Sequence, residues 1–374
     1  MGKRVNGKKM ILKERDFVEA YRDPGLIRKI SAEIAAASKK KIRLMEVCGG
    51  HTHAIHKHGL LSFLPENIEL LSGPGCPVCV SSQGFIDRAV ALSNLRHVII
   101  ATYGDMMRVP GTHSSLERKK AEGNDIRMVY SVLEALETAK RNKTKEVIFL
   151  GIGFETTAPS SAAAILLAER EGIKNFYLLS AHKIMPPALE ALVMANDQIH
   201  GFIAPGHVSS ITGYAPYKRL TDVYHRAVVI SGFEPVDIML SVYLLVGQVE
   251  KQSFRVENEY TRAVRPEGNK QAQEVIKKVF VLTDAEWRGI GVIPGSGLGI
   301  SGNYSSFDAL TRFEVSLPEA VLPVGCICGE IMRGRKSPEE CRLFTTVCTP
   351  ASPVGACMVS DEGTCSIYFK YRSR

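Results

Sequence analysis

Nine cysteines are the residues of this sequence best suited to chemistry, and they are unevenly spaced. Three lie in the first eighty residues and six in the last 49, with none between positions 80 and 325. No secretory leader is expected, and clustered thiols in a reducing compartment favour metal or redox chemistry over structural disulfides. We therefore expect the function to depend on these two groups of cysteines.

The first motif combines one thiol with several imidazoles and reads Cys48-Gly49-Gly50-His51-Thr52-His53, with His56 and His58 close behind. A thiolate and imidazoles on a glycine loop can bind a soft or borderline metal. We expect Cys48 and His51 to belong to a metal or catalytic site. The alternative is an ordinary turn with one buried thiol and exposed histidines.

The second motif is a Cys-x-x-Cys pair and reads Gly73-Pro74-Gly75-Cys76-Pro77-Val78-Cys79. It precedes a predicted helix, and a helix N-terminus favours the thiolate form of cysteine. Reversible dithiol/disulfide chemistry at Cys76 and Cys79 is therefore expected. The competing interpretation is half of a zinc site, although no second Cys-x-x-Cys is present.

The third group lies near the C-terminus, where 12, 6 and 16 residues separate Cys328, Cys341, Cys348 and Cys365. Four thiolates on loops rich in glycine and proline can hold a cubane iron–sulfur cluster or a Cys₄ zinc ion. Unlinked buried thiols are the remaining alternative. Cys326 and Cys357 have no assigned role.

Predicted strands and helices alternate, with short glycine-bearing turns, from about residue 41 to 245. The fold class is expected to be α/β, with two consecutive parallel-sheet domains of Rossmann-like type and a loop-rich C-terminal iron–sulfur domain. Cys48 and Cys76 would lie where ligands bind, beyond the carboxyl ends of strands. The expected divisions are N-terminal helices packed on the C-terminal domain (1–40), two α/β domains (41–143 and 144–245) and the C-terminal domain (246–374).

Two glycine loops, 151–153 and 297–302, invite a nucleotide-binding interpretation. The first lacks the third glycine of the dinucleotide fingerprint, and the second is not followed by a long helix. Structural turns are the preferred interpretation of both. A helix is also predicted over 127–141.

The composition is that of a soluble globular protein, with 45% hydrophobic and 23% charged residues. No apolar run approaches the roughly 18 residues that a bilayer span needs. The net charge of +8 resides in residues 1–43, which carry 13 Lys and Arg against 5 Asp and Glu. We expect a cytoplasmic protein that binds neither nucleic acid nor membrane.

Taken together, the motifs resemble those of the HypD family of [NiFe]-hydrogenase maturation proteins over nearly the whole chain. The resemblance includes the three cysteine groups and three further stretches: Tyr103-Gly104-Asp105-Met106, Gly153-Phe154-Glu155-Thr156-Thr157-Ala158-Pro159 and Ala204-Pro205-Gly206-His207-Val208.

This resemblance implies that Cys328, Cys341, Cys348 and Cys365 ligate a [4Fe–4S] cluster. It also implies that Cys76 and Cys79 are redox-active and that Cys48 helps to hold an iron ion. On such a scaffold, together with HypC, iron acquires cyanide and carbon monoxide. HypE supplies the cyanide, and the finished unit passes to the hydrogenase large subunit.

The resulting hypothesis is an assembly scaffold in which Cys48, near His51, and a HypC thiolate bind the iron, and Cys76/Cys79 and the cluster exchange electrons. Whether such a scaffold is an enzyme in its own right stays open. The alternative hypothesis is a stand-alone iron–sulfur thiol–disulfide oxidoreductase acting on a protein disulfide. A basic nucleic-acid binder with structural zinc is a third interpretation.

Overall fold

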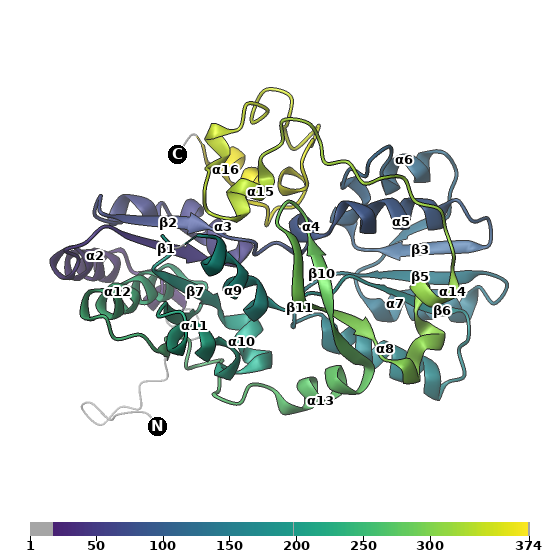
Figure 1. Ribbon diagram of the computed structural model, residues 1–374, viewed down its shortest axis with the longest axis horizontal. Helices are drawn as coiled ribbons and strands as arrows, with labels where there is room; N and C mark the ends of the chain where they lie inside the picture. Colours follow the sequence, from purple (N-terminus) through teal and green to yellow (C-terminus); the bar gives the residue numbers. More distant parts are fainter. Residues whose placement is uncertain (1–17, 197, 373–374) are drawn as a thin grey trace.

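The computed structural model describes residues 18–196 and 198–372. Two parallel sheets form two lobes that lie next to each other in Figure 1, and a loop-rich C-terminal region covers their junction. The α/β class, the two parallel sheets and the loop-rich region carrying cysteines agree with the prediction.

The first lobe contains a five-stranded parallel sheet in the order β2-β1-β7-β8-β9. Its strands are β1 (Ile42–Glu46), β2 (Ile68–Ser72), β7 (Gly201–Pro205), β8 (Ala227–Ser231) and β9 (Val256–Asn258). Its helices are α2 (Pro24–Ala37), α3 (Gly49–Lys57), α9 (Met185–Ala195), α10 (Gly206–Thr212), α11 (Lys218–Asp222) and α12 (Pro235–Lys251).

The second lobe contains a four-stranded parallel sheet in the order β4-β3-β5-β6. Its strands are β3 (Val98–Thr102), β4 (Ile126–Met128), β5 (Glu146–Gly151) and β6 (Phe176–Ser180). Its helices are α5 (Gln83–Ser93), α6 (Leu116–Ala121), α7 (Val132–Arg141) and α8 (Ala158–Arg170), and the short α4 (Pro77–Val80) precedes them.

The rest of the chain joins the lobes and caps them. After α13 (Lys270–Val279), the antiparallel hairpin of β10 (Phe280–Trp287) and β11 (Gly291–Ile300) lies between the lobes in Figure 1. The remaining helices are short: α14 (Ala309–Arg312), α15 (Cys328–Met332) and α16 (Thr364–Tyr371).

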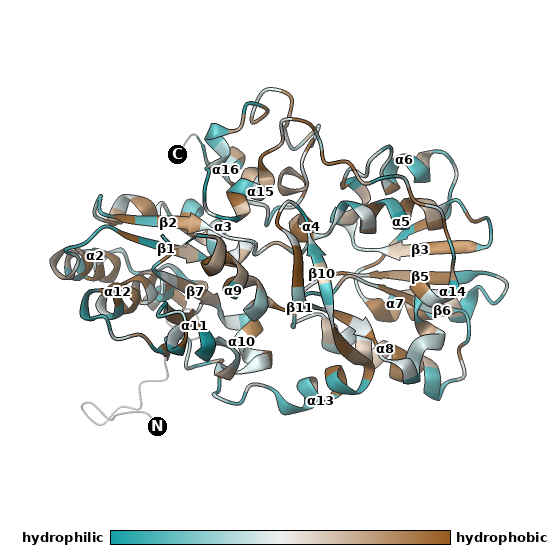
Figure 2. Cartoon of the chain, in the orientation of Figure 1, coloured by the Kyte–Doolittle hydropathy of each residue, from teal (hydrophilic) through white to brown (hydrophobic). Residues whose placement is uncertain are grey.

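Helices cover both faces of the central strands, which explains their composition. Every residue of β3, β7 and β8 is buried, and hydrophobic colours run along β3 and β5 in Figure 2. Strands buried on both faces are expected to be continuously apolar rather than alternating. The polar residues that follow such strands then lie at the sheet edge.

Helix α2 corrects the predicted placement of the N-terminal helices. The Asp23 carboxylate caps it by accepting from the backbone N–H of Leu26 at 3.1 Å. The helix packs against α12 of the first lobe, not against the C-terminal region. The reason is its apolar stripe, which buries Ile27, Ile30 and Ile34. The part of the expected N-terminal helices that precedes residue 18 lies outside the described residues.

The domain boundaries expected along the chain do not separate the two sheets. Residues 41–143 contribute β1 and β2 to the first lobe but β3 and β4 to the second, and 144–245 are divided in the same way. The cause is that β1 pairs with β7, so the chain leaves the first lobe and later returns to it. Pairing between distant strands leaves no local sequence signal.

Three local predictions also differ from the structure. The helix predicted over 127–141 is a short strand, β4, followed by α7. The glycine run 297–302 lies largely in β11, where Gly297 and Gly299 pack closely on Thr283 of β10. The glycine loop predicted after Cys48 is the start of helix α3.

Candidate redox and metal centre

The two N-terminal cysteine motifs meet at the carboxyl ends of β1 and β2, as the sequence predicted. These strands are parallel neighbours, so both motifs leave the sheet at the same edge. A Cβ atom added at Gly75 would lie 2.3 Å from the Cα of Cys48, closer than any side chain could be accommodated. The backbone N–H of Gly49 also donates to the Gly75 carbonyl at 3.4 Å. Glycine at position 75 therefore permits this close approach.

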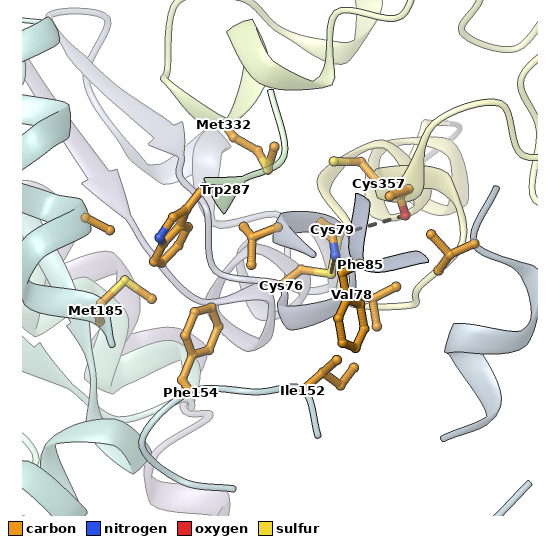
Figure 3. Close-up of a cluster of buried hydrophobic side chains, with 14 of the residues drawn as sticks. Cys76, Val78, Cys79, Phe85, Ile152, Phe154, Met185, Trp287, Met332 and Cys357 are labelled. Carbon is orange, nitrogen blue, oxygen red and sulfur yellow. Dashed lines mark hydrogen bonds between the residues drawn. A yellow bond between two sulfur atoms is a disulfide. The ribbon is translucent and has the colours of Figure 1, made fainter. Parts of the chain in front are cut away.

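Cys76 and Cys79 form a disulfide with a Cα–Cα distance of 5.2 Å. Cys76 precedes α4, and its sulfur accepts from the backbone N–H of Cys79 at 3.2 Å. Figure 3 shows the pair among apolar side chains, including Val78 and Phe85. Cys76 is 4% exposed and Cys79 2%, so the pair is shielded from bulk solvent.

Cys48 is a buried thiol whose surroundings disfavour its charged form. Burial, reinforced by the carboxylates of Glu362 and Glu46, raises the pKa of Cys48 to about 12. Glu46 accepts from the backbone N–H of Cys48 at 3.1 Å and from the hydroxyl of Thr52. Burial raises the pKa of Glu46 itself to about 7. A cation bound at Cys48 would supply the positive charge that this site lacks.

His51 is the histidine of the first motif that is completely buried. Its Nε2 atom lies 2.9 Å from the carbonyl oxygen of Gly232, and its ring stacks on Phe233 at 4.7 Å between centroids. Burial lowers the pKa of His51 to about 4, so its ring is neutral at physiological pH. His207 contacts the same Phe233 ring at 5.3 Å. Phe233 therefore brings two imidazoles to the edge at which Cys48 lies.

Two other histidines of the motif contact the C-terminal helix instead. The Tyr371 hydroxyl lies 2.8 Å from His53 Nε2, and the ring of Tyr368 packs on His56 at 4.3 Å. These contacts join α16 to α3. The histidines of this motif thus have two roles. His53 and His56 contact α16, whereas His51 contacts Gly232 and Phe233 at the sheet edge.

The C-terminal region contacts both N-terminal motifs. The sulfur of Cys79 lies 3.9 Å from the carbonyl oxygen of Ala356, as the dashed line in Figure 3 shows. A Cβ atom added at Gly49 would lie 2.4 Å from the carbonyl oxygen of Glu362. The disulfide and the C-terminal cysteines are therefore adjacent, with Cys357 next to Ala356 in the chain.

Four C-terminal thiols affect one another's protonation. Cys326 and Cys328 have their sulfurs 3.3 Å apart, and the thiols of Cys357 and Cys365 shift the pKa of Cys328. The bond with Cys328 lowers the pKa of Cys326 to about 6, whereas the pKa of Cys328 is raised. The two cysteines that the sequence left unassigned, Cys326 and Cys357, thus belong to this group.

The other two predicted ligands contact backbone groups of neighbouring loops. Cys341 Sγ is 3.9 Å from the carbonyl oxygen of Gly325, and Cys348 Sγ accepts from the backbone N–H of Val354 at 3.4 Å. Over the described part of the chain, no three His, Cys, Asp or Glu side chains are already arranged as a metal site. The predicted set of four is therefore brought into one region but not around one point.

The donor set nevertheless suits a cubane cluster in kind and number. All six thiols from Cys326 to Cys365 are free of disulfide bonds and lie on loops or short helices. A Cβ atom added at Gly355 would lie within 2.8 Å of the sulfurs of Cys326 and Cys328, so this glycine leaves room beside them. Thiolates presented by loops are the ligands that such clusters take.

Sequence reasoning did not single out Glu155 for a role, although it stood within a quoted motif. One carboxylate oxygen of Glu155 accepts from the backbone N–H of Met185 at 2.9 Å, and the other is buried with no hydrogen-bond partner. Burial raises the pKa of Glu155 to about 7. The signal available in the sequence was a carboxylate four residues after an apolar strand.

The glycine loop before α8 is closed rather than open to a phosphate. Gly153 has a φ of 125°, and the Thr157 side chain fills the space where a Cβ would be. The Thr157 hydroxyl donates to the carbonyl of Ile152 at 3.0 Å. This arrangement agrees with the structural interpretation of the loop.

Comparison with known proteins identifies the family to which this architecture belongs. The HypD family model, described as the hydrogenase formation hypA family, matches residues 25–372. The chain belongs to the HypD family. A hydrogenase expression/formation protein of Methanocaldococcus jannaschii is 46% identical over 94% of this chain and 98% of its own length.

Two bacterial relatives of this HypD family member carry the name hydrogenase maturation factor HypD. The protein from Cupriavidus necator is 44% identical, covering 95% of this chain and 97% of its own. The protein from Escherichia coli is 41% identical, covering 96% and 98%. The chain thus has a role in hydrogenase maturation. Among the described residues, no helix has the length and apolar character needed to cross a membrane.

Proposed function

We propose that this protein is the scaffold on which, in complex with HypC, an iron ion acquires cyanide and carbon monoxide. HypE supplies the cyanide, and the completed unit passes to the large subunit of [NiFe]-hydrogenase. The observation that carries the proposal is the close approach at Gly75, which holds Cys48 against the loop of the Cys76–Cys79 disulfide. A soft iron ligand and a two-electron thiol pair thus share one sheet edge.

Cys48 would bind the iron substrate together with a thiolate from HypC. Because the pKa of Cys48 is raised to about 12, its thiol is protonated at neutral pH and loses that proton only as iron binds. Reduction of the Cys76–Cys79 disulfide breaks the S–S bond and takes up two electrons and two protons. Re-oxidation would re-form the S–S bond and release two protons and two electrons, which the iron substrate at Cys48 would accept.

The C-terminal cysteines would hold a [4Fe–4S] cluster, which when bound supplies single-electron transfer. We keep Cys328, Cys341, Cys348 and Cys365 as the proposed ligands. Because Cys326 lies 3.3 Å from Cys328, the two thiols compete for one position in this set. The contact between Cys79 and Ala356 would bring this C-terminal region next to the disulfide.

Anaerobic co-expression with HypC tests the scaffold role. The purified complex should carry iron beyond four atoms per cluster and show infrared stretches of cyanide and carbon monoxide. Cys48→Ser should lose both signals, whereas Lys57→Ala, an exposed residue at the end of the same helix, should keep them. Retention of the cyanide stretch in Cys48→Ser would refute the role of Cys48.

Serine variants of the six C-terminal cysteines test the ligand set. Iron and acid-labile sulfide are counted after anaerobic purification, and variants at the four proposed positions should lose the cluster. If Cys328→Ser retained the cluster and Cys326→Ser lost it, Cys326 would replace Cys328 in the proposed ligand set. Zinc in place of iron, without sulfide, would overturn the cluster.

The alternative of a stand-alone oxidoreductase has one observation in its favour, the disulfide itself. Its burial argues against it, because a protein substrate must reach Cys76 or Cys79 to exchange disulfides. Reduction of a protein disulfide at an undiminished rate without HypC, and no added iron with HypC, would favour this alternative.

A further inference from the structure

The turn between β8 and α12 lies against His51 and contains two groups that fix its position. The Gly232 carbonyl is bonded to His51 Nε2, and the Phe233 ring stacks on the imidazole. Phe233 also lies close to Gly50, where an added Cβ would be 3.3 Å from its ring. This turn was not among the motifs that the sequence singled out.

The hydrogen bond to Gly232 determines which nitrogen of His51 carries the proton. A carbonyl oxygen only accepts, so Nε2 at 2.9 Å must be the donor. The neutral ring then has its lone pair on Nδ1, and this atom is buried without a hydrogen-bond partner. His51 is thus held with an available basic nitrogen on the side opposite to Gly232.

Gly232 is itself held by two acidic side chains from different elements. Its backbone N–H donates to Glu259, which follows β9, at 3.3 Å. An added Cβ would lie 2.1 Å from the carboxylate of Asp237 in the first turn of α12. Asp237 also accepts from the backbone N–H of Glu234 at 3.2 Å, which fixes the start of that helix.

Arg262 balances the charge of Asp237. The carboxylate of Asp237 is completely buried and receives two hydrogen bonds from the guanidinium, one of them at 2.9 Å. The guanidinium lies between Tyr21 at 4.0 Å and Tyr260 at 4.3 Å from the ring centroids. A bidentate pair stacked in this way has little freedom to rotate.

We propose that Glu259, Asp237 and Arg262 are positioning residues that act through the Gly232 carbonyl to keep His51 in its Nε2–H tautomer, with an unprotonated Nδ1. This inference deepens the proposed function and rests on it for its purpose: an unprotonated nitrogen on the residue whose backbone N–H donates to the Cys48 carbonyl at 2.9 Å. The tautomer itself is a property of the protein alone.

The first test reads the tautomer directly by nuclear magnetic resonance of the full-length chain labelled with ¹⁵N-histidine. The His51 signals are identified by their absence in His51→Gln, and the wild type should show only the Nε2–H form at pH 7. Glu259→Met removes the acceptor for the Gly232 N–H, so the tautomer ratio should shift by about tenfold. Glu259→Gln keeps an acceptor oxygen and should restore the wild-type ratio.

A matched control and a second variant separate positioning from general destabilisation. Arg219→Ala removes an exposed pair with Glu190 in the same lobe and should leave the tautomer unchanged. Arg262→Met should shift the ratio in the same direction as Glu259→Met. A wild-type ratio in folded Glu259→Met and Arg262→Met would overturn the inference, as would an Nδ1–H form in the wild type.

Binding of ferrous iron alone, measured anaerobically, distinguishes this inference from the function on which it rests. If Glu259→Met weakens binding by about tenfold and Glu259→Gln does not, both stand. If Cys48→Ser leaves iron binding unchanged while the tautomer still shifts, the proposed function fails and the positioning role remains. If Cys48→Ser abolishes binding but the tautomer never shifts, only the positioning role fails.

Discussion

The cysteines of this protein are positioned by two different kinds of structure. Cys48, Cys76 and Cys79 follow neighbouring strands of a parallel sheet, whose register fixes where each motif begins. The six C-terminal cysteines lie on loops and one-turn or two-turn helices. At the sheet edge a neighbouring backbone defines the thiol environment, whereas in the C-terminal region the sulfurs contact one another.

This difference has a consequence for how each region tolerates change. A backbone held by a sheet does not move aside, so a single methyl group there is costly. Thiol side chains on loops can rotate, and rotation is what binding a common group requires of them. The sheet edge thus suits a preformed site, and the C-terminal loops suit one completed by its ligand.

Gly75→Ala should break the sheet-edge site and has the largest expected effect. The added Cβ would collide with the backbone of Cys48, so the two motifs must separate. We expect a loss of about 3 kcal/mol in the free energy of unfolding, together with loss of ferrous iron binding. Urea unfolding and anaerobic iron titration measure both. Gly84→Ala, whose Cβ meets nothing within 4 Å in α5, is the control and should be neutral or stabilising.

Glu155 gives the sheet-based half of the molecule a pH dependence. Its pKa is raised from 4.5 to about 7 by burial, so the folded state binds more protons than the unfolded state between these values. Its contribution to stability is complete below pH 4.5 and is lost as the pH rises through 7. Between pH 5 and 8, wild type should lose about 2 kcal/mol relative to Glu155→Gln in urea unfolding. Parallel curves for the two proteins would contradict the raised pKa.

Gly355→Ala is the C-terminal counterpart of Gly75→Ala and should cost less. The added Cβ would meet only the sulfurs of Cys326 and Cys328, at 2.7 and 2.8 Å. Because those sulfurs can rotate away, we expect about 1 kcal/mol of lost stability. Iron and sulfide content should fall, since the displaced thiols no longer converge. A loss as large as that of Gly75→Ala would remove the distinction between the two regions.

Tyr371→Phe should have the smallest effect, at the contact between the two regions. It removes the hydroxyl that lies 2.8 Å from His53 and keeps the ring. About 0.5 kcal/mol of stability should be lost. Faster hydrogen exchange in α16, with no change in the second lobe, would locate the effect. Unchanged exchange in α16 would show that the bond does not hold this helix.

The parts of the fold that the sequence predicted are those encoded by short-range patterns of apolar residues and glycines. The strands before Cys48 and Cys76 were predicted because their apolar runs end in glycine, and their parallel pairing placed both motifs together. Helix α3 was missed because Gly49 and Gly50, which begin it, are poor helix formers. The close approach of the Glu362 backbone requires glycine at position 49, and Phe233 packs tightly on Gly50.

The interleaved lobes and the C-terminal contacts were outside the reach of such patterns. Pairing of β1 with β7 depends on segments far apart in the chain, and no periodicity marks it. The family resemblance favoured Cys328 and left Cys326 and Cys357 unassigned, although the sulfur of Cys326 lies 3.3 Å from that of Cys328 and the thiol of Cys357 shifts the pKa of Cys328. Loops have no repeating geometry from which contacts between their side chains could be derived.

The path of the chain between the lobes also sets the order in which the protein can be made. The backbone N–H of Arg43 donates to His200, 157 residues later, where β7 joins the sheet beside β1. A ribosome must therefore synthesise the whole second lobe before β1 of the first lobe has both of its neighbours. The Gly232 turn, which positions His51, emerges later still. The nascent chain thus exposes Cys48 well before its pocket exists, and iron captured at that stage would meet a thiol without its partners.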